Sequence, residues 1–204
     1  MAQAHIDRLC EQVRDCTICA DVLKDGVRPI VQMGQSARIL IAGQAPGSKV
    51  HASGIPFDDP SGDRLRDWLG VDKATFYDPQ KVAILPMGFC YPGRGKSGDL
   101  PPLKVCAEVW RQDLLDSLNN IQLTVVIGQY AQKWHFGRDG IPEIKKNLTQ
   151  TVKHWRDYYR ASNQQIIPLP HPSPRNNIWI SNNPWFETDI LPTLQQRVGK
   201  ILNA

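Results

Sequence analysis

Four of the five cysteines have the spacing of a metal site. They form two pairs, Cys16-x2-Cys19 and Cys90-x15-Cys106. A Cys-x2-Cys pair can bring two thiolates to one side of a tight turn, and a second pair completes a set of four ligands. Such a set suits either a zinc ion or a 4Fe–4S cluster, and spacing alone does not separate the two. Cys10 lies on the apolar side of the first expected helix and is interpreted as packed core.

The remaining composition describes a soluble globular protein. An odd number of cysteines and a polar N-terminus without an apolar signal core argue against a disulfide framework and predict a cytoplasmic location. No run approaches the roughly 18 apolar residues of a membrane span, so we expect no membrane partner. The net charge of +4 is mildly basic and permits a nucleic-acid partner if the positive charge gathers on one face.

Two loops carry residues that can contact a ligand. The turn Gly43–Gly47 reads GQAPG, and its glycines and proline form a stiff bend whose backbone N–H groups can point at a ligand. The segment His171–Pro174 reads HPSP, and its two prolines stiffen the loop around the histidine. The alternatives are an ordinary β–α connection for the first loop and a satisfied structural histidine for the second.

The elements that must position these loops alternate along the chain. Four short apolar runs predict buried parallel strands, at residues 38–43, 81–85, 124–128 and 165–169. Helical patterns cover about 3–15, 61–70, 103–119, 129–136 and 182–202, the last kinked or restarted at Pro192. Pro168 predicts an edge or strand-end position for the fourth strand. This order predicts an α/β three-layer sandwich with a central four-stranded parallel sheet flanked by helices, as one domain over residues 1–204.

In such a fold, ligands bind beyond the carboxyl ends of the strands. Three loops of unusual composition emerge there, at residues 43–47, 86–102 and 171–175. We therefore expect the chemistry of the protein where these three loops meet.

Taken together, the motifs resemble the uracil-DNA glycosylase superfamily, and within it the iron–sulfur branch called family 4. Residues 43–47 match that branch's Gly-Glu-Ala-Pro-Gly turn at four of five positions, and residues 54–57 match its Gly-x-Pro-Phe. Residues 61–62 fit the small pair that opens its next helix, and residues 171–174 carry its His-Pro-Ser-Pro unaltered. The four spaced cysteines match its cluster ligands, and the likeness covers about residues 10–200.

The resemblance implies a 4Fe–4S cluster rather than zinc, held by Cys16, Cys19, Cys90 and Cys106. Its role in the family is structural, so it would tie the N-terminal segment, about residues 1–36, to the long loop after the second strand. The loop's high content of glycine and proline agrees with a segment that needs such support.

The resemblance also implies an activity and a partner. The chain would be a monofunctional DNA glycosylase of base excision repair, acting as a monomer. It would flip a deaminated base, with uracil as the first expectation, out of DNA and hydrolyse its N-glycosidic bond.

The implied roles of the site residues fall into three groups. His171 would donate a hydrogen bond to the departing base, with Gln44 as a second catalytic residue. The base would lie on the ring of Phe57 and against the turn residues Gly43, Ala45 and Gly47. Contacts with DNA would come from Ser173, Pro174 and Arg175, where Arg175 fills the stack that the base has left. The alternatives are core packing for Phe57 and a solvated surface position for Arg175.

Two departures from the family pattern keep other functions open. Gln44 and Ala45 leave the turn without a carboxylate, and Pro86 stands where the iron–sulfur branch has an asparagine that reads uracil. Asp58, Asp59 and His51 are the nearby residues that could orient water instead. A second hypothesis is a non-catalytic iron–sulfur module on the same fold that binds DNA or senses damage. A third is a zinc-stabilised α/β protein with an unrelated small ligand.

Overall fold

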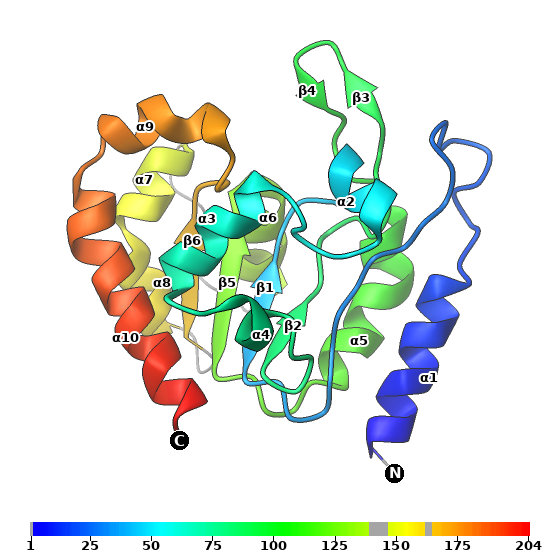
Figure 1. Cartoon of the computed structure of the whole chain (residues 1–204), viewed down its shortest axis with the longest axis horizontal. Helices are drawn as coiled ribbons and strands as arrows, with labels where there is room; N and C mark the ends of the chain where they lie inside the picture. The colour runs from blue at the N-terminus through cyan, green and yellow to red at the C-terminus, as the bar shows by residue number, and fades with distance from the viewer. Residues whose placement is uncertain (1, 139–146, 162–164) are drawn as a thin grey trace.

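The computed structural model describes residues 2–138, 147–161 and 165–204. At its centre lies a four-stranded parallel sheet in the order β2-β1-β5-β6 (Figure 1). The strands are β1 (Ile39–Ala42), β2 (Val82–Ile84), β5 (Leu123–Ile127) and β6 (Ile166–Leu169), and every residue in them is buried. Each strand lies within the apolar run that predicts it or begins one residue before it, so the predicted α/β sheet is confirmed.

The order of the strands places β6 at one edge of the sheet, as Pro168 predicts. Thr124 N donates to Gln165 O at 3.0 Å where β5 meets β6. Because successive residues of a strand alternate in the direction of their hydrogen bonds, Ile167 and Leu169 also face β5. The nitrogen of Pro168 therefore faces the open edge, where a missing N–H leaves no bond of the sheet unmade.

Helices cover both faces of the sheet, which completes the three layers. On one face, α3 (Pro60–Leu69) and α10 (Leu191–Leu202) share a core with β1, β2, β5 and β6. On the other face lie α1 (Ala2–Arg14), α5 (Gln112–Asp116) and α6 (Gly128–Arg138). The helix α1 buries the apolar face that its sequence predicts, including Cys10 at 5% exposure.

The remaining elements are short. The other helices are α2 (Ser48–Ser53), α4 (Lys73–Phe76), α7 (Leu148–Lys153), α8 (Trp155–Ala161) and α9 (Asn177–Ser181). A small antiparallel hairpin joins β3 (Arg94–Gly95) to β4 (Gly98–Asp99), and a 3-10 turn covers Pro174–Asn176. None of the helices in the described part of the chain is long and apolar enough to cross a bilayer.

Two of the predicted helices contain a wider turn. The helix expected at 103–119 is a π-helical segment, Ala107–Arg111, that leads into α5. The helix expected at 182–202 has a second π-helical segment, Phe186–Ile190, that leads into α10. Pro192 stands in the first turn of α10, so the helix starts again at the proline, as the sequence allows.

The N-terminal segment is attached to the sheet by direct contacts. Gln32 pairs with Ile84 in an isolated antiparallel bridge, and its side-chain amide donates to Val82 O at 2.9 Å. Arg28 Nη1 donates to His51 O and Ala52 O, both at 2.7 Å, at the end of α2. These contacts attach residues 28–32 to β2 and α2, and the predicted tie through a cluster stays a prediction.

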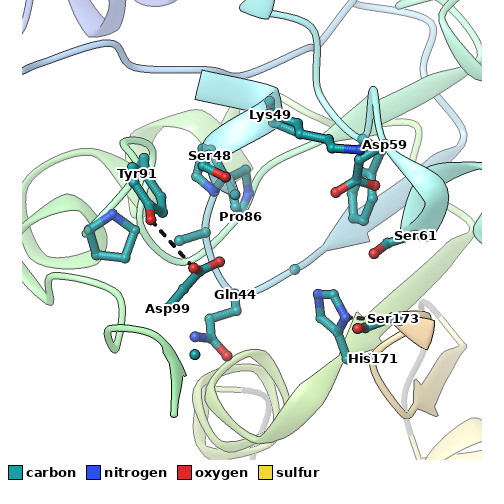
Figure 2. Close-up of a pocket in the computed structure, with 18 of the residues that line it drawn as sticks. Gln44, Ser48, Lys49, Asp59, Ser61, Pro86, Tyr91, Asp99, His171 and Ser173 are labelled. Atoms are coloured by element: carbon teal, nitrogen blue, oxygen red, sulfur yellow. Dashed lines mark hydrogen bonds between the residues drawn. The ribbon is translucent and has the colours of Figure 1, made fainter. Parts of the chain in front are cut away.

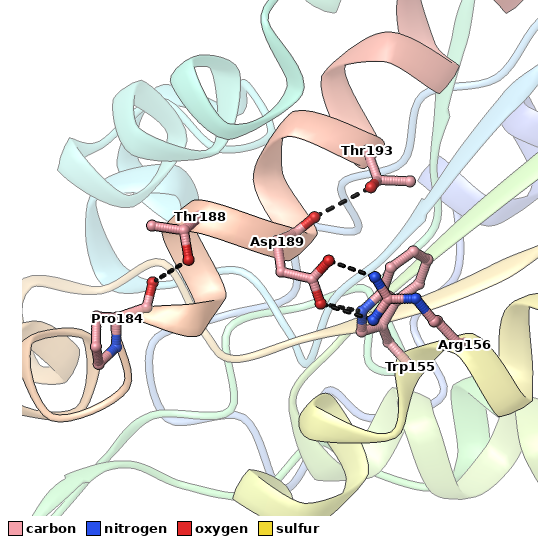
Figure 3. A network of polar contacts seen from close by, with 6 residues as sticks. All are labelled: Trp155, Arg156, Pro184, Thr188, Asp189 and Thr193. Carbon is pink, nitrogen blue, oxygen red and sulfur yellow. Dashed lines mark hydrogen bonds and ion pairs between the residues drawn. The ribbon is translucent and has the colours of Figure 1, made fainter.

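A polar network joins α8 to the C-terminal helices (Figure 3). Arg156 faces Asp189 with two parallel hydrogen bonds, of which Nη1 to Oδ2 measures 2.7 Å. Trp155 Nε1 donates to the same carboxylate at 3.4 Å, and the guanidinium lies 4.6 Å from the centre of the Trp155 ring. Thr193 Oγ1 donates to Asp189 O at 3.0 Å, so the network also spans the junction between the π-helical segment and α10.

Candidate active site

A cavity of about 560 Å³ lies at the carboxyl ends of the strands, where the three unusual loops meet. The predicted site residues that line it are Gly43, Gln44, Ala45, Gly47, Phe57, His171, Ser173 and Arg175. Pro174 is not among the lining residues; it begins the 3-10 turn that follows. The fold thus brings together side chains from three parts of the chain, although their roles remain predictions.

The loops after β1 and β2 run side by side at the floor of the cavity. Met87 N donates to Gly43 O and Gly88 N donates to Gln44 O, both at 2.9 Å. Pro86 falls between two residues whose N–H groups point at β1, since Leu85 N also donates to Ile41 O. A proline at this position therefore breaks none of these bonds, and its ring lines the cavity.

Phe57 presents its ring to the cavity from an unusual backbone conformation. Its φ of 55° lies in the left-handed region, which few residues other than glycine adopt. A Cβ placed on Gly43 would lie 3.4 Å from the Phe57 ring, so the ring lies close above the end of β1. Phe76 contacts the same ring edge-to-face at 6.1 Å between centroids. The ring is therefore both packed on the core and exposed to the cavity.

The start of α3 packs closely against the backbone of Phe57. A Cβ on Gly62 would lie only 1.7 Å from Phe57 O, so this position has no room for a side chain. Tyr77 Oη donates to that carbonyl at 3.3 Å. Asp59 caps α3, because its Oδ1 accepts from Gly62 N at 2.9 Å.

His171 is held by its own loop in a defined tautomer. Ser173 N donates to Nδ1 at 3.2 Å, so in the neutral ring the proton is on Nε2, which is left to donate to a ligand. Burial lowers the pKa of His171 below its usual value, and the charges of Asp59 and Asp99 only partly oppose this. Asn176 Nδ2 donates to His171 O at 2.7 Å and closes the loop. The geometry thus provides a neutral hydrogen-bond donor in the cavity.

Sequence reasoning missed a buried arginine behind the floor of the cavity. Arg111 is fully buried, and its Nη1 donates to Leu85 O at 3.0 Å and to Pro86 O at 2.8 Å. Its Nη2 lies 2.8 Å from His135 Nε2, and Trp134 stacks on the guanidinium at 4.9 Å. Burial lowers the pKa of Arg111 to about 9, aided by the charge of Arg138. No signal in the sequence set it apart, because the expected helix at 103–119 also contains Lys104, Glu108, Asp113 and Asp116.

Charged and polar side chains surround the mouth of the cavity (Figure 2). Three exposed cations line it, Lys49, Arg94 and Arg175. The carboxylates that line it, within the part of the chain that the structure describes, are those of Asp59 and Asp99. Of the residues expected to orient water, Asp59 is thus present. Asp58 and His51 are not among the lining residues, and His51 Nε2 instead lies 3.0 Å from Asp25 O.

All five cysteines are free thiols in the structure. The four predicted ligands influence one another: burial raises the pKa of Cys90 to about 11, and the charges of Cys106, Cys19 and Cys16 act in the same direction. Over residues 2–138, 147–161 and 165–204, however, no three His, Cys, Asp or Glu side chains are close enough together to hold a metal ion as they stand. The thiols therefore share one region without forming a single-ion site.

Comparison with known proteins gives a family. A family model described as the uracil DNA glycosylase superfamily matches residues 31–195, most of the chain. A solved structure, that of wild-type SMUG2 from Pedobacter heparinus, is similar at 16% sequence identity with a TM-score of 0.45. That likeness covers 83% of this chain and 77% of the SMUG2 chain.

Proposed function

Because the chain belongs to the uracil DNA glycosylase superfamily, whose members are DNA glycosylases, we propose that it removes a deaminated base from DNA. One observation carries this proposal: the ring of Phe57, the neutral His171 and the Gly43–Gly47 turn line a single cavity. A base that has been flipped from the stack needs an aromatic surface, a donor for its oxygen and a close backbone, and this cavity offers all three.

The proposed reaction starts with a base stacked on Phe57, a contact worth about 1–3 kcal/mol. As the bond between the base and C1′ breaks, negative charge develops on the base oxygen. The Nε2–H of His171 stabilises that charge, and it helps most in the transition state because the charge is greatest there. Gln44 and the backbone of the turn hold the base in place.

Uracil is the first substrate we propose, with hypoxanthine and xanthine as alternatives. Pro86 offers neither a side-chain hydrogen bond nor a backbone N–H. Polar side chains that line the cavity and can read a base instead include those of Gln44, Ser48, Ser61 and Tyr91. A changed set of polar contacts can change the preferred base by orders of magnitude.

Oligonucleotides that carry each of these bases test the function. Single- and double-stranded substrates are incubated with the protein, and strand breaks are measured with and without alkali. We expect breaks only after alkali, as a monofunctional enzyme gives, and affinity that falls steeply with salt because phosphate contacts dominate it.

A non-catalytic module that binds DNA is the second candidate, since neither Gln44 nor Ala45 supplies the turn with a carboxylate. Salt-dependent binding of damaged DNA without cleavage of any base would favour this candidate over the glycosylase. If the protein neither binds damaged DNA nor cleaves any base, both candidate functions are excluded.

We further propose that Cys16, Cys19, Cys90 and Cys106 hold a 4Fe–4S cluster. Four soft thiolates are the ligand set that such a cluster takes. Each thiolate of such a cluster would bind a different iron. The cluster would fasten the segment before β1 to the loop that carries the β3–β4 hairpin.

Anaerobic purification tests the cluster. We expect about four irons per chain and a broad visible absorption band. Cys90→Ser should lose iron, whereas Cys10→Ala, which changes the cysteine packed on α1, should keep it. One zinc and no iron, or a Cys90→Ser variant with its iron intact, would contradict the proposal.

A further inference from the structure

Hydrolysis of an N-glycosidic bond needs a water molecule that is held and deprotonated as it attacks. The Gly43–Gly47 turn has no carboxylate for this purpose, because it contains Gln44 and Ala45. The cavity nevertheless has two carboxylates, which reach it from other elements: Asp59 from the start of α3 and Asp99 from β4.

Both carboxylates approach the same point of the turn. A Cβ built on Gly47 would lie 3.7 Å from Asp99 Oδ2 and 4.0 Å from Asp59 Oδ2. The glycine therefore leaves a small space that two acidic oxygens border. Both charges also act on His171, where they raise its pKa against the effect of burial, so the acids and the histidine share the cavity.

Asp59 already has a structural task. Its Oδ1 accepts from Gly62 N at 2.9 Å and caps α3. Lys49 extends toward it across the mouth of the cavity (Figure 2). This carboxylate is thus part of the helix cap, and Asp59→Asn, which keeps the cap, gives a matched comparison for Asp99.

Asp99 is differently placed. It is exposed on the hairpin, and the buried Tyr91 donates a long hydrogen bond of 3.5 Å to its Oδ1 (Figure 2). Burial, followed by the charges of Asp99 and Asp25, raises the pKa of Tyr91, which keeps the phenol protonated as a donor. The other oxygen, Oδ2, faces Gly47. Tyr91 thus orients the carboxylate while one oxygen stays available for water.

The hairpin also contacts the loop that carries His171. A Cβ on Gly98 would lie 2.6 Å from Arg175 Nη1, and Gly98 has a φ of 146° that favours glycine. The charged or titratable groups around Asp99 therefore come from three parts of the chain. Tyr91 and Arg94 lie on its own loop, where Arg94 pairs with Asp99 across the hairpin, Asp59 lies across Gly47, and His171 and Arg175 follow β6.

We propose that Asp99 binds and activates the water that hydrolyses the glycosidic bond, in place of the acid that the turn lacks. The inference rests on the proposed glycosylase activity. The water oxygen forms a bond to C1′ as the C1′–N bond breaks, and the electron pair of that bond leaves with the base, whose oxygen His171 stabilises. The water proton passes to Asp99 Oδ2, and the base anion takes up a proton from solvent after release.

Single-turnover cleavage at saturating enzyme tests the assignment, with Asp99→Asn compared with Asp59→Asn. Both variants remove one negative charge from the cavity, and asparagine caps a helix as well as aspartate does. We expect Asp99→Asn to lower the rate about 10²-fold or more, as the loss of a general base does. Asp59→Asn should lower it by less than about 10-fold, because only its charge on the site is lost. Binding of an abasic-site duplex and the melting temperature should be unchanged for Asp99→Asn.

Two results would overturn the role of Asp99 alone: cleavage by Asp99→Asn at close to the wild-type rate, or an equal loss in Asp59→Asn. A loss of cleavage that comes with weaker binding and earlier melting would also overturn it, since Asp99 would then be structural. If the wild-type protein cleaves no base, the proposed function fails with it, and this result is distinct from the others.

Discussion

Two features of the environment of His171 determine the tautomer and the charge of its ring. The N–H of Ser173 occupies Nδ1, and burial favours the uncharged ring. The imidazole therefore keeps a proton on Nε2 without carrying a positive charge, and it does so at neutral pH because its pKa lies below the usual value.

Substitution of His171 should separate catalysis from binding. We expect His171→Ala and His171→Asn to lower the single-turnover cleavage rate by roughly 10²-fold or more, as the loss of one such donor does. Affinity for an abasic-site duplex should change little, because phosphates and stacking dominate it. If either variant cleaves at the wild-type rate, His171 takes no part in the mechanism. If a variant instead loses DNA binding and melts at a lower temperature, the role of the loop is structural.

At the residue scale, the sequence predicted the groups that belong to recognisable motifs. The turn Gly43–Gly47, Phe57 and His171 all line the cavity. Two residues were missed, because the partners of Arg111 are distant in the sequence and Asp99 lies in a segment without a periodic pattern. Arg111 binds carbonyls 25 and 26 residues away, and Asp99 reaches the cavity through a hairpin of two-residue strands.

Among the elements, α3 depends on a position without a side chain. Gly62→Ala would place a methyl group 1.7 Å from Phe57 O, so the helix and Phe57 must move apart. We expect a loss of about 2 kcal/mol or more in the free energy of unfolding, as overpacking costs. Urea denaturation measures it, and cleavage should fall as well because Phe57 is displaced.

Gly199→Ala in α10 provides the matched control. A Cβ on Gly199 meets nothing within 4 Å, and the residue lies inside a helix. Alanine should therefore stabilise the protein by about 0.5–1 kcal/mol. The contrast fails if both glycines tolerate alanine equally.

The network around Asp189 should contribute only modestly to stability. Arg156 lowers the pKa of Asp189 through its hydrogen bonds, so the stabilisation is present above the usual aspartate pKa and is lost as pH falls below it. Both side chains are partly exposed to solvent, at 50% and 37%. Asp189→Asn should therefore cost about 1 kcal/mol or less in urea denaturation at neutral pH. A larger loss, or one that persists in strong acid, would contradict the ion-pair explanation.

Elements with a strong period were predictable, whereas those set by tertiary contacts were not. The four strands and α1 follow directly from their apolar patterns. The segments Ala107–Arg111 and Phe186–Ile190 differ from ordinary helix only in the width of one turn, which local sequence does not encode strongly. The β3–β4 hairpin lies in a loop rich in glycine and proline, where no periodic pattern exists.

For the whole molecule, two histidines with lowered pKa values, His135 and His171, make stability depend on pH. Burial, with Arg111 and Arg138 nearby, lowers the pKa of His135 well below 6.5, and burial also lowers that of His171. Below pH 6.5 the unfolded chain then binds more protons than the folded one. The free energy of unfolding therefore falls as pH decreases through that value and is unaffected above it.

Thermal melting at about pH 7.5 and about pH 5.5 checks this expectation. The melting temperature should drop at the lower pH, and His135→Gln, whose amide oxygen can still accept from Arg111, should reduce the drop. His5→Gln, at an exposed position on α1, should leave it unchanged. If the melting temperature drops equally in the wild type, His135→Gln and His5→Gln, the pH dependence comes from other groups.

Pro168 has a consequence for encounters between copies of the protein. An open sheet edge offers its outward amide groups to a strand of another molecule, and an apolar edge such as Ile166–Leu169 is otherwise a site of aggregation. The proline nitrogen has no hydrogen to donate, and its ring stands where the neighbouring backbone would have to approach. An incoming strand would therefore find no N–H at Pro168, which disfavours self-association by strand addition at β6.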